Sequence, residues 1–200
     1  MSNLSFDELD DILEKKNGKS IHQIWFGTIP NRISAMYKFH TLQSFRESWI
    51  EKNPTFYHVI WDKNMCRLFL KKYYSEYLNM FNDYEYDIQR CDFIRYFILY
   101  HYGGIYADMD YFCCKSFEDI FKSHEDKDVY FVELPTAKHV GNSLIISKPN
   151  AKFWKQLFID LINTSDKPWH FTITLKVTYS TGNHFINRIY NKYGNSNNIG

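Results

Sequence analysis

The sequence lacks the features that mark zinc-finger, membrane-spanning and nucleic-acid-binding proteins. It has 4 cysteines in 200 residues, and their spacing matches no zinc pattern. It has no apolar run of about 18 residues, which a bilayer crossing needs, and its acidic N-terminal stretch has no signal-peptide core. Its net charge is only +1, which argues against nucleic acid or an anionic membrane surface as a partner.

The cysteines favour a reducing environment. Cys66 and Cys91 stand apart in the sequence, whereas Cys113 and Cys114 are neighbours. We predict that these neighbours are one core residue and one rim residue of a strand rather than a disulfide. Since no membrane segment accompanies them, we expect a soluble protein in the cytoplasm or in another reducing compartment.

Apolar and aromatic residues are abundant. The hydrophobic content is 44%, and aromatic residues make up 19% of the chain. A chain of this size can bury one sizeable core. We therefore predict an N-terminal helix in residues 1–18, opened by a capping box of Ser5 and Glu8 and running to about Lys16. Residues 19–200 are predicted to form a single catalytic domain.

Strand and helix patterns alternate along that domain, which predicts an α/β fold. A strand, a helix and a second strand joined by short loops imply a right-handed parallel crossover, with ligands collecting where the strands end. The predicted strands are 20–30, 55–61, one following Asp110, 129–135 and 140–148. The predicted helices are 35–52, 64–74, 87–101 and 149–163, with a short one near 121.

The run YGGIYADMD, residues 102–110, holds the main candidate site. Gly103 and Gly104 are expected to end the preceding helix with positive φ angles. In an extended backbone Asp108 and Asp110 point to one face while Met109 points to the other. Two carboxylates this close favour a divalent cation with hard oxygen ligands, such as magnesium, manganese or calcium, which substrate phosphates also bind.

The run CDFIRYFILYHYGGIYADMDYF and the earlier IHQIWFG resemble the signature of the DXD-type glycosyltransferases of family 32. These are relatives of the initiation-specific α-1,6-mannosyltransferases and, more distantly, of the glucosylating bacterial toxins. The resemblance implies a glycosyltransferase A fold, a Rossmann-like mixed sheet flanked by helices. It also implies retaining transfer of a sugar from a UDP- or GDP-sugar to a glycan or protein acceptor, with Mn²⁺ or Mg²⁺ as cofactor.

The resemblance assigns roles to individual residues. Asp108 and Asp110 would hold the metal, and Arg95 would pair with the diphosphate. Asp92 would accept hydrogen bonds from sugar hydroxyls, and Tyr106 would lie beside the donor. Without the resemblance, Asp92 and Arg95 are a helical ion pair three residues apart.

Four further candidates have competing interpretations. Trp25 stacks on the base by resemblance, or is a core residue. Asp62 or Asn64 contacts the donor, or Asp62 caps the helix that follows it. Asn142 contacts the sugar, or is a turn residue.

The C-terminal part departs from the family. Asn183 stands where the family has the proline of a Thr-Gly-Pro sequence, and a later histidine-containing segment is missing. Either the product is truncated or His184 completes the metal site. A catalytically incomplete carbohydrate-binding remnant and a nucleotide-sugar phosphohydrolase are the alternative functions.

Overall fold

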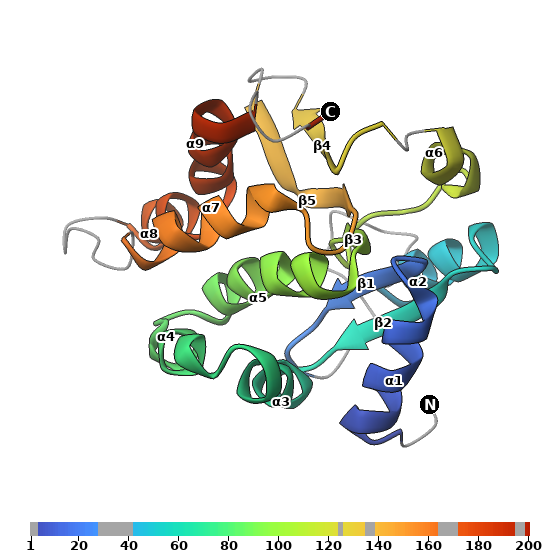
Figure 1. Ribbon diagram of the computed structural model, residues 1–200, viewed down its shortest axis with the longest axis horizontal. Coiled ribbons are helices and arrows are strands. Elements are labelled where there is room, and N and C mark those ends of the chain that lie inside the picture. The colour runs from blue at the N-terminus through green and yellow to red at the C-terminus, as the bar shows by residue number, and fades with distance from the viewer. Residues whose placement is uncertain (1–3, 28–41, 124–125, 135–138, 164–171, 195–198) are drawn as a thin grey trace.

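The computed structural model, shown in Figure 1, describes residues 4–27, 42–123, 126–134, 139–163, 172–194 and 199–200. Its sheet has the strand order β2-β1-β3-β5-β4. The strands are β1 (Ser20–Ile24), β2 (Tyr57–Trp61), β3 (Gly104–Ala107), β4 (Val129–Leu134) and β5 (His139–Ser147). The helices are α1 (Phe6–Lys16), α2 (Leu42–Lys52), α3 (Lys63–Tyr73), α4 (Leu78–Asp83), α5 (Asp87–Tyr102), α6 (Glu118–Ser123), α7 (Lys152–Ile162), α8 (Ile173–Ser180) and α9 (Asn183–Tyr193).

The sheet has a parallel half and an antiparallel half. β1 pairs in parallel with both β2 and β3, as the predicted crossover requires. β5 pairs antiparallel with β3 and with β4. The central strand β3 therefore lies at the join between the two halves, and the predicted mixed α/β sheet flanked by helices is confirmed.

Helices cover both faces of the sheet. α5 crosses the front of the sheet in Figure 1, and α2 lies behind it. Alternate residues of β3 follow this division, because Ile105 and Ala107 pack with Trp49 of α2 while Tyr106 belongs to the larger cluster that contains α5. One strand thus connects two apolar layers.

Helix α5 is buried on all sides rather than along one stripe. Every residue from 92 to 99 is buried, whereas Ile88 near the start of the helix is 52% exposed. The aromatic side chains of this helix account for the burial, since Phe97 stacks on Phe158 of α7 with ring centroids 4.1 Å apart. A fully buried helix carries its polar residues into the interior as well.

The turn from α5 into β3 needs glycine. Gly103 and Gly104 have φ angles of 67° and 94°, as the sequence predicts. A Cβ atom on Gly104 would lie 2.4 Å from the carbonyl oxygen of Ser20 in β1. The glycine pair therefore lets β3 run directly beside β1 after the helix ends.

Several predicted boundaries are confirmed. Ser5 and Glu8 form the predicted capping box, and Asn17 ends α1 in the left-handed conformation. Helix α7 lies within the predicted 149–163 range. Among the described residues, no helix combines the length and apolar character that a membrane crossing requires.

Other predictions need correction or fall outside the described residues. The helix expected over 35–52 is seen from Leu42 onward, and residues 28–41 lie outside the described part. Residues 111–117 form no strand, because the chain turns after β3. Cys113 is buried and Cys114 exposed, as expected for core and rim, but they belong to this irregular segment, and all four cysteines are free thiols.

Candidate functional site

The two aspartates of the site lie on a tight turn, which we call the acidic turn (residues 108–110). β3 ends at Ala107, and the backbone N–H of Asp108 donates to the carbonyl of Ser143 in β5 at 2.8 Å. The N–H of Tyr111 then donates back to the carbonyl of Asp108 at 3.1 Å. The expectation of an extended strand through Asp110 is therefore wrong, because the bond from Tyr111 to Asp108 closes a turn directly after the last pairing with β5.

The residue between the aspartates anchors the acidic turn. Met109 is 4% exposed and packs with Leu42 and Phe45 of α2. Asp110 is exposed, and the side chain of Asp108 is 33% exposed. The predicted opposition of Met109 to the carboxylates is thus seen, although a turn produces it rather than a strand.

Asp108 is held by two side chains. Its Oδ1 accepts from the Tyr106 hydroxyl at 2.6 Å and from Arg95 Nη1 at 3.2 Å. The Arg95 guanidinium in turn lies 4.4 Å from the centre of the Tyr106 ring. Both of these bonds reach the same carboxylate oxygen, Oδ1.

Arg95 is the buried centre of the site. It is 2% exposed, and its Nη2 contacts Asp92 Oδ1 at 2.7 Å. Its Nη1 also donates to the carbonyl of Asn142 in β5 at 2.6 Å. Burial disfavours the charged guanidinium, but Tyr106, Asp108 and Asp92 together raise the pKa of Arg95. One cation therefore ties α5, β5 and the acidic turn together.

Asp92 is also buried and fully engaged with the protein. It is 4% exposed, and it accepts from Asn142 Nδ2 at 3.0 Å and from the Thr181 hydroxyl at 3.3 Å. Burial raises the pKa of Asp92 to about 6, against the lowering effect of Arg95. The predicted ion pair with Arg95 is present, but direct contact of either residue with a donor stays a prediction.

The chemistry of the acidic turn suits a hard divalent cation. Partial desolvation raises the pKa of Asp110, and the charge of Asp108 raises it further. A cation between these carboxylates would relieve that repulsion. Direct binding of a metal ion by Asp108 and Asp110 stays a prediction.

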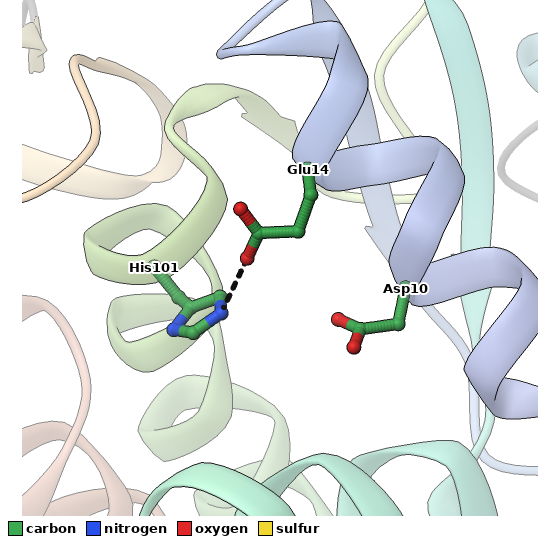
Figure 2. A group of neighbouring side chains, drawn as sticks. All are labelled: Asp10, Glu14 and His101. Carbon is green, nitrogen blue, oxygen red and sulfur yellow. Dashed lines mark hydrogen bonds and ion pairs between the residues drawn. The ribbon is translucent and has the colours of Figure 1, made fainter.

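A different group of potential ligands lies near the N-terminal helix. Ligand atoms of Asp10, Glu14 and His101 lie within 4.8 Å of one another, and Figure 2 shows His101 joined to Glu14. Both Asp10 oxygens already accept hydrogen bonds, from Tyr102 on Oδ1 and from Tyr73 and Lys72 on Oδ2. This group anchors α1 to α3 and α5, and the Lys72 ammonium already supplies a cation to Asp10 Oδ2.

His184 is not part of any such three-ligand group among the described residues. It lies in the first turn of α9, where its ring stacks on Tyr179 at 4.5 Å. The sequence-based suggestion that it completes the metal site remains a prediction.

The remaining candidates lie around the ends of the parallel strands. Trp25 follows β1, is half-buried and packs on the cluster that contains Met109. Asp62 caps α3 by accepting from the N–H of Met65 at 2.8 Å, so the capping interpretation is confirmed. Asn64 is exposed in the first turn of α3. Contact of these residues with a donor stays a prediction.

Asn142 is not a turn residue, since it lies inside β5 and is 5% exposed. Its amide also donates to the Tyr96 hydroxyl at 3.2 Å, and that hydroxyl donates to the carbonyl of Thr181 at 2.6 Å. The sequence analysis missed Tyr96 and the partners of Thr181, because no local pattern joins residues so far apart. The Thr-Gly sequence at 181–182 was the one visible signal.

The mixed sheet and the acidic turn at the end of its central strand define a glycosyltransferase A domain. The structure is similar to the solved "PaToxG Glycosyltransferase", with a TM-score of 0.59 and 16% identity over 96% of this chain and 75% of that one. It is also similar to the UDP-bound glycosyltransferase domain of the YGT toxin, with a TM-score of 0.56 and 9% identity over 91% of this chain and 78% of that one.

Residues 40–129 of this chain match the family described as "Glycosyltransferase sugar-binding region containing DXD motif". The chain is similar to the mannosyl phosphorylinositol ceramide synthase CSH1 of Saccharomyces cerevisiae, with 31% identity over 82% of this chain and 43% of the relative. The chain spans about half the length of the curated relatives that it matches. The resemblance predicted from the sequence is confirmed.

Proposed function

We propose that the protein transfers a sugar from a nucleotide-sugar donor to an acceptor hydroxyl at the acidic turn. The observation that carries this proposal is the clamp on Asp108, in which Tyr106 and Arg95 both bind Oδ1. Such a clamp orients one carboxylate rigidly while Asp110 beside it stays exposed. A pre-oriented carboxylate pair suits a site where phosphate charge must be balanced.

We propose Mn²⁺ or Mg²⁺ as the cofactor, held by Asp110 and by Oδ2 of Asp108. When bound, the cation would offset the negative charge of the departing nucleoside diphosphate. Arg95 is buried behind the acidic turn, so its role is to keep Asp108 oriented and to add positive potential at the phosphates. Asp92 and the Asn142 carbonyl fix the guanidinium in that position.

We propose a hexose as the transferred sugar, and mannose as the first to test. The similar yeast protein is named for mannosyl transfer to phosphorylinositol ceramide, whereas a similar solved domain is bound to UDP. GDP-mannose and the UDP-sugars are therefore the donors to compare. Acceptors to compare are glycans, proteins and inositol phosphate headgroups.

We propose that transfer retains the anomeric configuration, with attack from the face that the leaving phosphate occupied. This proposal rests on the family resemblance. Proton NMR of the first product distinguishes the anomers, and an inverted linkage would contradict retention.

The experiment that tests the function begins with thermal shifts for GDP, UDP and their sugars, each with and without Mn²⁺. A ligand at about 100 times its dissociation constant stabilises the fold by about 2.7 kcal/mol. A metal-dependent shift with one nucleotide, followed by sugar transfer, supports the proposal. Free sugar released without an acceptor would indicate a phosphohydrolase, and glycan binding without nucleotide would indicate a binding protein.

The matching variant is Asp110→Ala. We expect turnover to fall on the order of 100- to 1,000-fold, because one charge-stabilising group at the reacting centre is lost. The melting temperature should stay unchanged, since Asp110 is exposed. Asp119→Ala, an equally exposed aspartate in the first turn of α6, is the control. Wild-type turnover in Asp110→Ala would exclude the metal role.

A further inference from the structure

Strand β5 separates from its neighbour β4 beside the site. Phe131 of β4 pairs with Ile145 of β5, and the next pair is Glu133 with Val140. The chain advances by two residues in β4 between these pairs but by five residues in β5. The extra residues of β5 form a bulge of the kind that redirects side chains near functional sites. Backbone N–H groups in such a bulge need acceptors from elsewhere.

Helix α9 supplies those acceptors through two asparagines. Asn183 Oδ1 accepts from the N–H of Asn142 at 3.0 Å, and Asn187 Oδ1 accepts from the N–H of Val140 at 3.3 Å. The two asparagines are four residues apart and therefore share one face of the helix. The helix replaces strand β4 as the hydrogen-bond partner of this part of β5.

The two residues that these bonds hold, Val140 and Asn142, differ in their other contacts. Val140 contributes an apolar side chain to the core. Asn142 instead donates its amide to Asp92 and offers its carbonyl to Arg95. A shift of the Asn142 backbone would move the acceptor of Arg95 Nη1, the same nitrogen that binds Asp108.

We propose that Asn183 is a positioning residue of the site, acting through Asn142 on Arg95 and so on the orientation of Asp108. The preceding residues hold the same cluster from another side, because the Thr181 hydroxyl donates to Asp92. A Cβ atom on Gly182 would lie 3.2 Å from Asp92 Oδ2, which shows how closely this segment packs. Residues 181–183 thus contact both Asp92 and Asn142.

The residue type at position 183 is informative. Asn183 is the first residue of α9, where proline is well accommodated because the first helical N–H needs no partner within the helix. Proline is also the residue that the resemblance predicts here. Asparagine adds a side-chain acceptor that proline lacks, and this acceptor is the one that Asn142 uses.

The test compares Asn183→Ala and Asn183→Pro, which remove the acceptor, with Asn183→Asp, which keeps a side-chain oxygen. We expect kcat to fall about three- to tenfold in the first two, the size of one hydrogen bond, with KM for the acceptor unchanged. Asn183→Asp should retain most of the rate. Asn187→Ala is the matched control, since it removes the equivalent bond to Val140, and its kcat should equal that of the wild type.

A second readout does not depend on activity. Amide hydrogen exchange at Asn142 should accelerate about tenfold in Asn183→Ala and Asn183→Pro, and the side-chain NMR signal of Arg95 Nε should shift. Neither change should occur in Asn187→Ala. The turnover readout rests on the proposed function, whereas the exchange readout does not. An inactive wild type with the expected exchange pattern would therefore contradict the proposed function but support the contact between Asn183 and Asn142. Wild-type exchange and an unshifted Arg95 signal in Asn183→Pro would overturn the inference.

Discussion

Two buried aspartates of this protein both pair with a cation, but their pKa values are shifted in opposite directions. Asp10 is 2% exposed and accepts from Lys72, Tyr73 and Tyr102. Although burial acts against it, these donors lower the pKa of Asp10. Asp92 is 4% exposed and also has a cationic partner, yet burial raises its pKa to about 6.

The difference lies in the surroundings of the two ion pairs, because each cation is shared between two carboxylates. The Lys72 ammonium binds Asp10 and the exposed Asp7, and two tyrosine hydroxyls also donate to Asp10. Arg95 contacts both Asp92 and Asp108, and the charge of Asp108 acts with burial to raise the pKa of Asp92. A pKa that burial and a specific charge partner shift in this way is a marker of functional sites.

The largest loss of stability is expected when Arg95 is removed. Arg95→Met leaves Asp92 buried without its cation, and we expect a loss of about 3–5 kcal/mol in the free energy of unfolding. Urea denaturation measures this loss, and turnover should disappear with it. Arg188→Met, which removes an exposed arginine of α9, should change stability by less than about 0.5 kcal/mol. Equal effects of the two changes would contradict the central role of Arg95.

Neutralising the other aspartate should cost stability alone. Asp10→Asn keeps the shape of the side chain but weakens the bonds from Lys72, Tyr73 and Tyr102, so we expect a loss of about 2 kcal/mol. The rate per folded molecule should not change, because this anchor does not touch the acidic turn. The neighbouring exposed Asp11 gives the control, Asp11→Asn. A fall in kcat would show that the two regions are coupled.

The smallest expected effect is the dependence of stability on pH, which should differ between the two aspartates. The folded pKa of Asp92 is raised to about 6 from 3.8, so its ionised form opposes folding, and stability relative to Asp92→Asn should rise by about 1 kcal/mol from pH 7 to pH 5. The folded pKa of Asp10 is lowered, so its stabilisation is present above pH 4 and is lost as the pH falls through that lowered pKa. Urea denaturation of each asparagine variant at pH 7, 5 and 3.5 measures both slopes. A parallel course for the two aspartates would contradict the opposite directions of their pKa shifts.

The part of the site that the sequence predicts is contiguous. α5, the glycine turn and β3 bring Asp92, Arg95 and the acidic turn together within residues 87–110. Helical spacing alone places Asp92 beside Arg95, and the glycines mark the change from helix to strand. Local rules are sufficient here because the contacts are themselves local.

Local sequence patterns do not predict the parts of the structure that contacts between distant segments determine. Asp10 is a polar residue in an amphipathic helix, and its burial follows from Tyr102, which lies 92 positions away. The chain turns at residues 108–110, where Met109 packs on Leu42 and Phe45 of α2, so period-two alternation predicts a strand that does not exist. The bulge that places Asn142 inside the site leaves no mark on the pattern of β5.

The spread of these contacts along the chain has a consequence for synthesis. Thr181 follows Asp92 by 89 positions and Asn142 follows it by 50. At roughly 5–20 residues per second, Thr181 is added about 4 to 18 seconds after Asp92. For that interval, the polar cluster of α5 lacks its last hydrogen-bond partner. The segment that carries the family signature is therefore made before the residues that complete its hydrogen bonds.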